Sequence, residues 1–190
     1  MNRAAGAGLA VDVRVAAIIA AAVAAGLASL LLLDPTNVKD STTRGGDIAA
    51  GVPVAKDVNG LRSLARVVGH PIYWAGPQPG YQYEVTKTAD GRIYVRYLPP
   101  EVQAGDTRIG FTFVATYPQR DAFGTVRAAL RNAGAKPVKA GGPGIAVTNS
   151  RLPQIVYLAY PRSDYLIEVY DRAAKRARSL VTSGQVGPVR

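Results

Sequence analysis

The 190-residue chain contains no cysteine and a single histidine. The lack of cysteine excludes disulfide bonds, thiolate metal sites and cysteine nucleophiles in any compartment. A Ser-His-acid site needs a histidine as base, and metal sites usually need several such ligands. His70 stands alone between Gly69 and Pro71, without a serine signature elsewhere. We therefore predict no catalytic residue, no cofactor and no metal site, and expect His70 to be a structural residue at a helix end.

Glutamate is also scarce, since the chain has only Glu84, Glu101 and Glu168. Paired carboxylates would be needed for general acid and base work. Glu84 is expected to face Arg96 across a hairpin, and Glu168 alternates away from its two apolar neighbours along a strand. We therefore expect both carboxylates to be solvated. An enzyme is the less favoured class of protein on these grounds.

One long hydrophobic run stands out, at 15–33 (VAAIIAAAVAAGLASLLLL), and is closed by Arg14 and Asp34. As a helix it would be roughly 28 Å long, about the thickness of the hydrocarbon core of a bilayer. A secretory signal would end in small residues at a cleavage site, whereas this run ends in leucines. We predict an uncleaved single-pass anchor with the bilayer as its partner. The alternatives are a cleaved signal or the buried helix of a soluble protein.

The rest of the chain divides into a tail, a stalk and a domain. Arg14 at the boundary favours a cytoplasmic tail at 1–14 and places the bulk of the chain outside the cytoplasmic membrane. Residues 34–56 are polar and show no helical or strand period, which predicts a flexible stalk. Residues 57–190 are then the extracytoplasmic domain.

Hydrophobic periodicity in this domain predicts about three helices, at 57–69, 121–134 and 171–184, each opened by an aspartate and closed by a glycine. Strands are expected at 81–88, 92–98, 110–118, 145–148, 154–160 and 165–170. This order predicts an α+β fold with a mainly antiparallel sheet and the helices on one face. A loose repeat, in which each half is a helix followed by three or four strands, is a further hypothesis.

The first two strands have two alternative registers. A three-residue loop with Gly91 in the left-handed conformation pairs Tyr83 with Tyr97 and Glu84 with Arg96, which separates apolar from charged side chains. A two-residue loop would put Glu84 opposite Tyr97 and mix the two faces. We therefore predict the three-residue loop.

Two further patterns have plain structural interpretations. The glycine-rich run 141–144 lacks the Lys-Ser/Thr pair and the following helix that a phosphate-binding loop requires, so we expect an ordinary loop. The chain has ten tyrosines, nine of them on expected strands. We expect them to pack in the core together with Trp74, and a surface that stacks on sugars or bases is the alternative.

Basic residues are in excess. Residues 34–190 hold 21 Lys and Arg against 12 Asp and Glu, a net charge of +9. The last expected helix groups four of them: Arg172, Lys175, Arg176 and Arg178. A solvated basic face is the plain interpretation. The functional one is attraction to an anionic envelope polymer or to acidic lipid headgroups, and these four are the candidate anion-binding residues.

The segment 61–100, with its HPIYWAG run at 70–76 and its tyrosine-rich hairpin, resembles an uncharacterised group of membrane-anchored proteins from G+C-rich Gram-positive bacteria. The resemblance is weaker over 110–118. It implies a cell-envelope location and transfers no activity and no functional residue.

We therefore expect a membrane-anchored extracytoplasmic module for binding or scaffolding, with an envelope polymer or another membrane protein as its partner. The alternatives are an envelope enzyme without a recognisable motif and a cytoplasm-facing nucleic-acid binder. Nucleic acid is the less favoured partner because no reader motif is evident. A deep pocket with perturbed ionisable groups would favour the enzyme, and a flat basic face would favour binding.

Overall fold

The computed structural model describes residues 48–190. The expected cytoplasmic tail, the expected anchor at 15–33 and most of the expected stalk lie outside the described residues. Within 48–190 there is no helix with the length and apolar character needed to cross a membrane.

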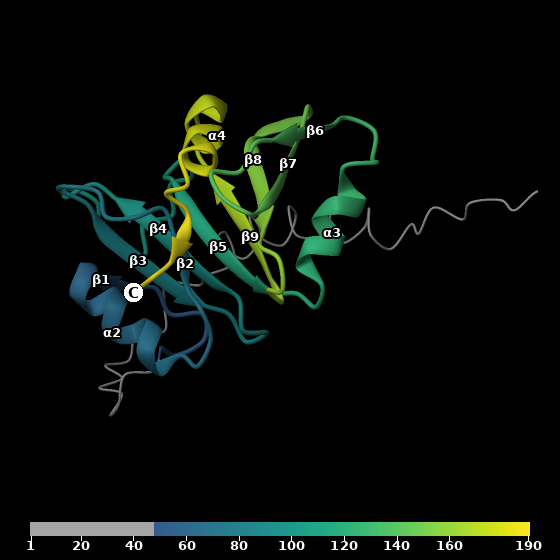
Figure 1. Cartoon of the computed structure of the whole chain (residues 1–190). Coiled ribbons are helices and arrows are strands. Elements are labelled where there is room, and N and C mark those ends of the chain that lie inside the picture. Colours follow the sequence, from purple (N-terminus) through teal and green to yellow (C-terminus); the bar gives the residue numbers. More distant parts are fainter. Residues whose placement is uncertain (1–47) are drawn as a thin grey trace, which may run out of the picture.

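Eight strands form one antiparallel sheet in the order β1-β3-β4-β5-β9-β8-β7-β6 (Figure 1). Their bounds are β1 (Val54–Lys56), β3 (Gln82–Lys87), β4 (Ile93–Leu98), β5 (Phe113–Pro118), β6 (Ala135–Val138), β7 (Ile145–Asn149), β8 (Leu152–Ala159) and β9 (Tyr165–Tyr170). Two short strands, β2 (Tyr73–Trp74) and β10 (Gly187–Pro188), pair separately. The pairing of β5 with β9 joins the two halves of the chain at the centre of the large sheet.

Three helices accompany the sheet, α2 (Val58–Val67), α3 (Ala122–Ala129) and α4 (Ala174–Thr182), so the predicted α+β fold with a mainly antiparallel sheet is confirmed. The aspartates expected to open the first two helices do so. Asp57 accepts a hydrogen bond from the amide of Gly60, and Asp121 accepts one from the amide of Gly124. Such side-chain caps satisfy amides that have no partner within the helix.

The helices lie on both faces of the sheet, and the expectation that they share one face is wrong. The side chains of α2 and α4 pack with the small β2/β10 ladder in one core cluster. Those of α3 pack in a second cluster with strand residues that alternate to the opposite side, such as Phe113, Ala115 and Tyr117 of β5. Since both faces carry buried apolar residues, the strands at the centre of the sheet are buried on both sides.

The predicted hairpin register is confirmed. Tyr83 pairs with Tyr97 and Glu84 with Arg96, and Gly91 has a φ of +81°. The predicted start of the domain needs correction, however. Residues 54–56, expected at the end of the stalk, form β1 and pair with β3, and Ile48 is buried in the first core cluster.

Candidate functional site

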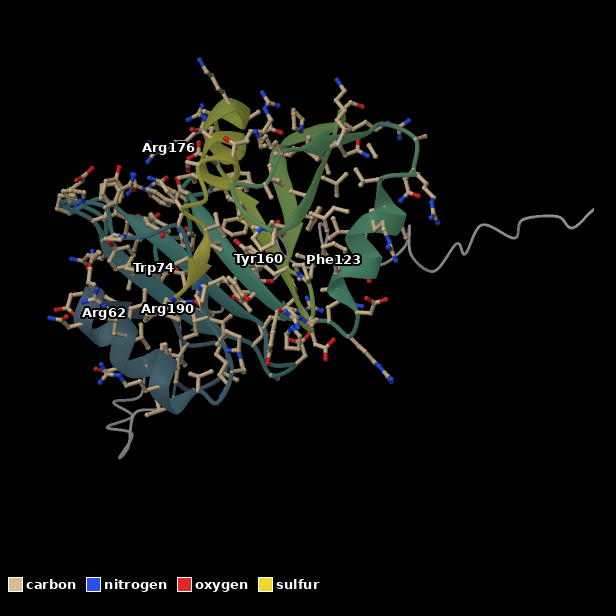
Figure 2. The ribbon with its side chains drawn as sticks, in the orientation of Figure 1. Arg62, Trp74, Phe123, Tyr160, Arg176 and Arg190 are labelled. Carbon is tan, nitrogen blue, oxygen red and sulfur yellow. The ribbon has the colours of Figure 1, made fainter. Side chains whose placement is uncertain are left out.

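The four predicted anion-binding residues come together on α4 and on the turn that precedes it. Arg172, Lys175, Arg176 and Arg178 are all exposed. The opposite side of α4, with Ala177 and Val181, is buried against the sheet. Figure 2 shows Arg176 on this helix, at one edge of the domain. The structure therefore places the predicted residues on one accessible surface.

The expectation that Asp171 opens the last helix is wrong, because the N-cap of α4 is Ala173 and has no side-chain cap; Asp171 instead holds the turn before the helix. Its Oδ1 accepts a hydrogen bond from the amide of Ala173 at 2.8 Å, and its Oδ2 accepts one from the hydroxyl of Thr112 at 2.6 Å. The same Oδ2 lies 3.2 Å from Nε of Arg176. Arg176 is the only one of the four with an ion-pair partner within residues 48–190, so three positive charges on this surface have no carboxylate beside them.

The loop 99–112, which joins β4 to β5, lies against the start of α4. Thr112 bonds to Asp171, and a β-carbon added at Gly110 would lie 3.7 Å from Cδ of Arg172. Arg108 belongs to this loop, and its side chain is 66% exposed. Sequence spacing does not reveal Arg108 as a neighbour, because only the pairing of β5 with β9 brings the loop to α4. We call Arg108, Arg172, Lys175, Arg176 and Arg178 the basic surface.

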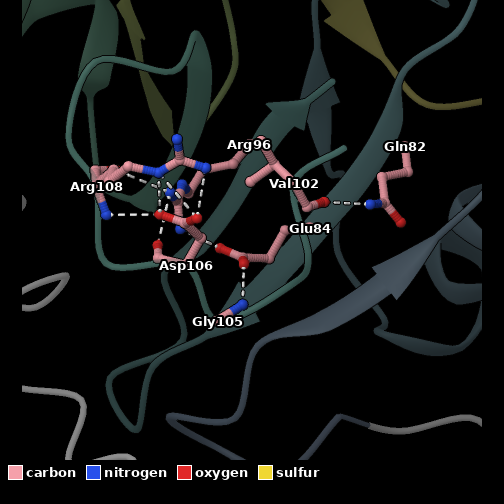
Figure 3. A network of polar contacts seen from close by, with 7 residues as sticks. All are labelled: Gln82, Glu84, Arg96, Val102, Gly105, Asp106 and Arg108. Atoms are coloured by element: carbon pink, nitrogen blue, oxygen red, sulfur yellow. Dashed lines mark hydrogen bonds and ion pairs between the residues drawn. The ribbon is translucent and has the colours of Figure 1, made fainter. Parts of the chain in front are cut away.

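A buried ion pair holds this loop on the sheet (Figure 3). Nη1 of Arg96 donates to Oε1 of Glu84 at 2.6 Å, and the two side chains are 5% and 2% exposed. Nη2 of Arg96 donates to the carbonyl oxygens of Asp106 at 3.0 Å and Arg108 at 3.2 Å. The amide of Gly105 donates to Oε2 of Glu84 at 2.6 Å. The expectation that Glu84 is solvated is therefore wrong, because the loop covers the pair.

The backbone of the loop supplies hydrogen bonds that the buried ion pair would otherwise make with water. Moving two charges out of water costs several kcal/mol per ion, and their attraction offsets this only when the remaining polar atoms are also satisfied. Here both oxygens of Glu84 accept hydrogen bonds, and the carbonyls of the loop accept from Arg96. The backbone on both sides of residue 107 is thereby fixed.

Arg108 is itself held by a neighbour. Its Nη2 lies 2.7 Å from Oδ2 of Asp106, and its Nε donates to both oxygens of that carboxylate at 3.0 Å. These hydrogen bonds lower the pKa of Asp106 to about 2 and raise the pKa of Arg108. The pair leaves the Arg108 side chain pointing out from a fixed loop.

Glu168 was also expected to be solvated and is instead 2% exposed. It lies on β9 between Ala115 of β5 and Tyr157 of β8, on the face that α3 covers. The hydroxyl of Tyr117 donates to its Oε2 at 2.5 Å. Burial raises the pKa of Glu168 to about 7, although the Tyr117 hydrogen bond and the charge of Arg92 act in the opposite direction. Closed from solvent, this carboxyl cannot touch a substrate in the observed conformation.

The remaining sequence patterns have structural roles. Nδ1 of His70 lies 3.1 Å from the carbonyl oxygen of Pro71, and the ring stacks on Tyr165. The run 141–144 is a loop before β7, and Gly141 lies so close to Gly184 that a β-carbon would be 2.1 Å from its amide nitrogen. All ten tyrosines are buried or half-buried, as predicted, and so is Trp74.

Within residues 48–190 no three His, Asp or Glu side chains lie together in a way that could hold a metal ion. Comparisons of the chain with protein-family models, with curated proteins and with solved structures found no match.

Proposed function

We propose that this protein is a membrane-anchored binding module of the cell envelope, attracted to anionic surfaces through the basic surface. The observation that carries the proposal is the grouping of five exposed cations at one edge of the domain, three of them without a carboxylate partner within 48–190. Because a charge that is already paired attracts an anion less, these three are the strongest contributors.

The charge balance of the domain supports the same function. Residues 48–190 hold 19 Lys and Arg and 9 Asp and Glu, a net charge of +10. A field of this sign attracts polyanions, and its reach is limited by a Debye length of about 8 Å at physiological salt. The attraction is therefore short-ranged and weakens as salt is added.

The proposed location rests on the sequence. An apolar run at 15–33 with Arg14 at its boundary supports a single-pass anchor with the domain outside the cytoplasm. Tethering keeps the domain close to one surface, so a weak attraction is enough to keep it there. A binding role is preferred to an enzyme because Glu168, the carboxyl with a raised pKa, is enclosed beneath α3.

The proposal can be tested with the full chain in detergent micelles and inorganic polyphosphate as the soluble anionic probe. The triple variant Arg172→Ser, Lys175→Ser and Arg178→Ser removes the three charges of the basic surface that have no carboxylate partner within 48–190. We expect its affinity for polyphosphate to fall several-fold at low salt and its salt dependence to become shallower. Titration by fluorescence anisotropy of labelled polyphosphate measures both.

The matched control removes the same charge elsewhere. Arg127, Arg131 and Arg151 are exposed and lie on α3, just after it and in the turn between β7 and β8. Their replacement by serine should change the affinity much less. Equal losses in the two triple variants, or no binding of the unmodified chain at low salt, would show that α4 carries only a solvated face.

A further inference from the structure

We propose that the loop 99–112 and the start of α4 form one surface that docks on a bilayer containing anionic lipids, with Ile109 entering the headgroup layer. This proposal rests on the proposed function and names the anionic surface that the basic residues contact. It makes Ile109, in addition to the basic surface, part of the binding surface.

Ile109 is the most exposed large apolar side chain within residues 48–190, at 67%. A single exposed apolar residue is common on protein surfaces and needs no explanation by itself. The backbone around Ile109, however, is fixed. Arg96 holds the carbonyl of the preceding residue from inside the domain, and Thr112 is bonded to Asp171.

The fixed backbone keeps the side chain of Ile109 on the surface of the domain. The nearby Phe111 is already engaged, since the guanidinium groups of Arg96 and Arg108 lie over its ring, at 5.2 Å and 5.6 Å from the centroid. For Ile109 to turn inward, the loop would have to release the carbonyls that solvate the buried Arg96. The fold therefore presents an apolar side chain to the exterior.

Two arginines flank the position of this side chain. Arg108 precedes it, and Arg172 lies beside the following residue, Gly110. From Arg172 the basic surface continues along α4. Two acidic residues at this edge, Asp106 and Asp171, are bonded to arginines of the same surface, and the exposed Glu101 is the other acid of the loop.

An apolar side chain flanked by arginines fits a bilayer better than a soluble polymer. A polyanion in water offers charges and nothing apolar for Ile109 to contact. The boundary between headgroups and acyl chains offers both, because arginine stems can lie along apolar surface while their charged ends reach lipid phosphates. Juxtamembrane basic residues are attracted to anionic leaflets in the same way.

The absence of cysteine makes a direct test practical, since one introduced cysteine is the only site for a thiol label. The full chain carrying Thr107→Cys is labelled with an environment-sensitive nitrobenzoxadiazole dye. It is then reconstituted into vesicles of phosphatidylcholine alone or of equal parts phosphatidylcholine and phosphatidylglycerol. We expect the emission to shift to shorter wavelength and to rise in the anionic vesicles only, and to return toward its initial value at high salt.

Two variants distinguish insertion of Ile109 into the bilayer from electrostatic attraction alone. Ile109→Ser in the labelled chain should abolish most of the shift, whereas Val67→Ser, at another exposed apolar residue at the end of α2, should leave it unchanged. A label at Arg151→Cys, in the exposed turn before β8, should not respond to lipid composition. Circular dichroism and the emission of the buried Trp74 verify that each variant is folded.

The outcomes distinguish this proposal from the proposed function. If the label at 107 stays in water in both kinds of vesicle while polyphosphate binding persists, the surface is a polymer-binding one and docking on the bilayer is wrong. If the emission shift is equally large in the Ile109→Ser variant, the side chain of Ile109 does not insert into the bilayer. If polyphosphate binding and the shift are both absent, both proposals fail.

Discussion

Glu168 is a carboxyl buried among tyrosine side chains, and its ionisation opposes folding. Its pKa is raised from an ordinary value of 4.5 to about 7, chiefly by burial. A group whose pKa is higher in the folded state contributes stability that is fully present below the unfolded pKa and is lost as the pH rises through the folded pKa. The difference in pKa corresponds to about 3 kcal/mol of stability, lost between about pH 4.5 and pH 7.

We therefore predict that Glu168→Gln makes the stability of the domain less dependent on pH. The neutral amide keeps an oxygen that can accept from Tyr117 and carries no charge to desolvate. Above about pH 7 the variant should exceed the unmodified chain in free energy of unfolding, measured by urea titration. Glu101→Gln, at an exposed carboxylate, is the control. An unchanged pH profile in Glu168→Gln would contradict the prediction.

Gly91 closes the hairpin between β3 and β4 in the left-handed conformation, with a φ of +81°. A β-carbon there would meet only Pro118, at an ordinary contact distance of 3.7 Å, so the cost of a side chain is backbone strain alone. We predict that Gly91→Ala lowers the free energy of unfolding by about 1 kcal/mol.

The control for this change is Gly142→Ala. A β-carbon at Gly142 would have no neighbour within 4 Å, and its backbone is not left-handed. Chemical denaturation should leave this variant close to the unmodified chain. Equal losses in the two variants would indicate that strain at Gly91 is not the cause.

For single residues, the cross-strand partner could be predicted from the sequence, whereas the burial of the side chain could not. The partners of Glu84 and Tyr83 follow from alternation along two adjacent strands, which is a local property. Whether a side chain on the polar face meets water depends on what covers that face. For Glu84 the cover is the loop 99–112, and for Glu168 it is α3, and neither follows from strand periodicity.

Among the elements, the loop 99–112 depends most on a single side chain. Arg96 reaches from β4 to two of its carbonyls while it neutralises Glu84. Removing one partner of a buried ion pair leaves an uncompensated charge, which costs about 3–5 kcal/mol. We predict that Arg96→Met lowers stability by this amount and increases amide hydrogen exchange in 99–112 more than in β7 or β8.

A double-mutant cycle tests the cause. Glu84→Gln combined with Arg96→Met removes both charges, so the double variant should recover part of the stability lost in Arg96→Met. If the double variant is no more stable than Arg96→Met alone, the pair is not the reason for the loss.

The elements that escape prediction are short or contain poor strand formers. β1 has three residues, β6 contains a proline (AKPV) and β10 is Gly-Pro. β1 and β10 take their positions from partners far along the chain, whereas β6 pairs with the next strand, β7, and forms the other edge of the sheet. Helix starts are easier, because the capping aspartates act locally. The end of α3 is at Ala129, before Gly134, since the amides of Arg131 and Asn132 bond only three residues back.

In the whole molecule, the helices cover opposite faces of one sheet. A repeat that places β5 on the antiparallel strand β9 is a rotation about an axis perpendicular to the sheet. Such a rotation keeps every helix on the same face of the sheet. Because α2 and α3 lie on opposite faces, they are not related in this way, and the hypothesis of a repeat is wrong for the helices. Sequence periodicity indicates which side of a helix is buried but not which face of the sheet it covers.

The start of the folded unit is a testable property of the whole domain. A chain beginning at residue 57 lacks β1 and the buried Ile48, and it leaves the edge of β3 open. We predict that it is less stable than a chain beginning at residue 48, by on the order of 3 kcal/mol from lost apolar burial. Equal urea midpoints for the two chains would place the boundary at 57.

The central pairing of β5 with β9 also dictates an order of events during synthesis. Phe113 of β5 pairs with Tyr170 of β9. This edge of β5 therefore has no partner until nearly the whole domain has left the ribosome. Until then the first half presents an open strand edge, the kind of template on which chains aggregate. β9, the last strand of the large sheet to be made, thus completes the middle of that sheet, and a nascent chain halted before Tyr165 would need a chaperone to shield β5.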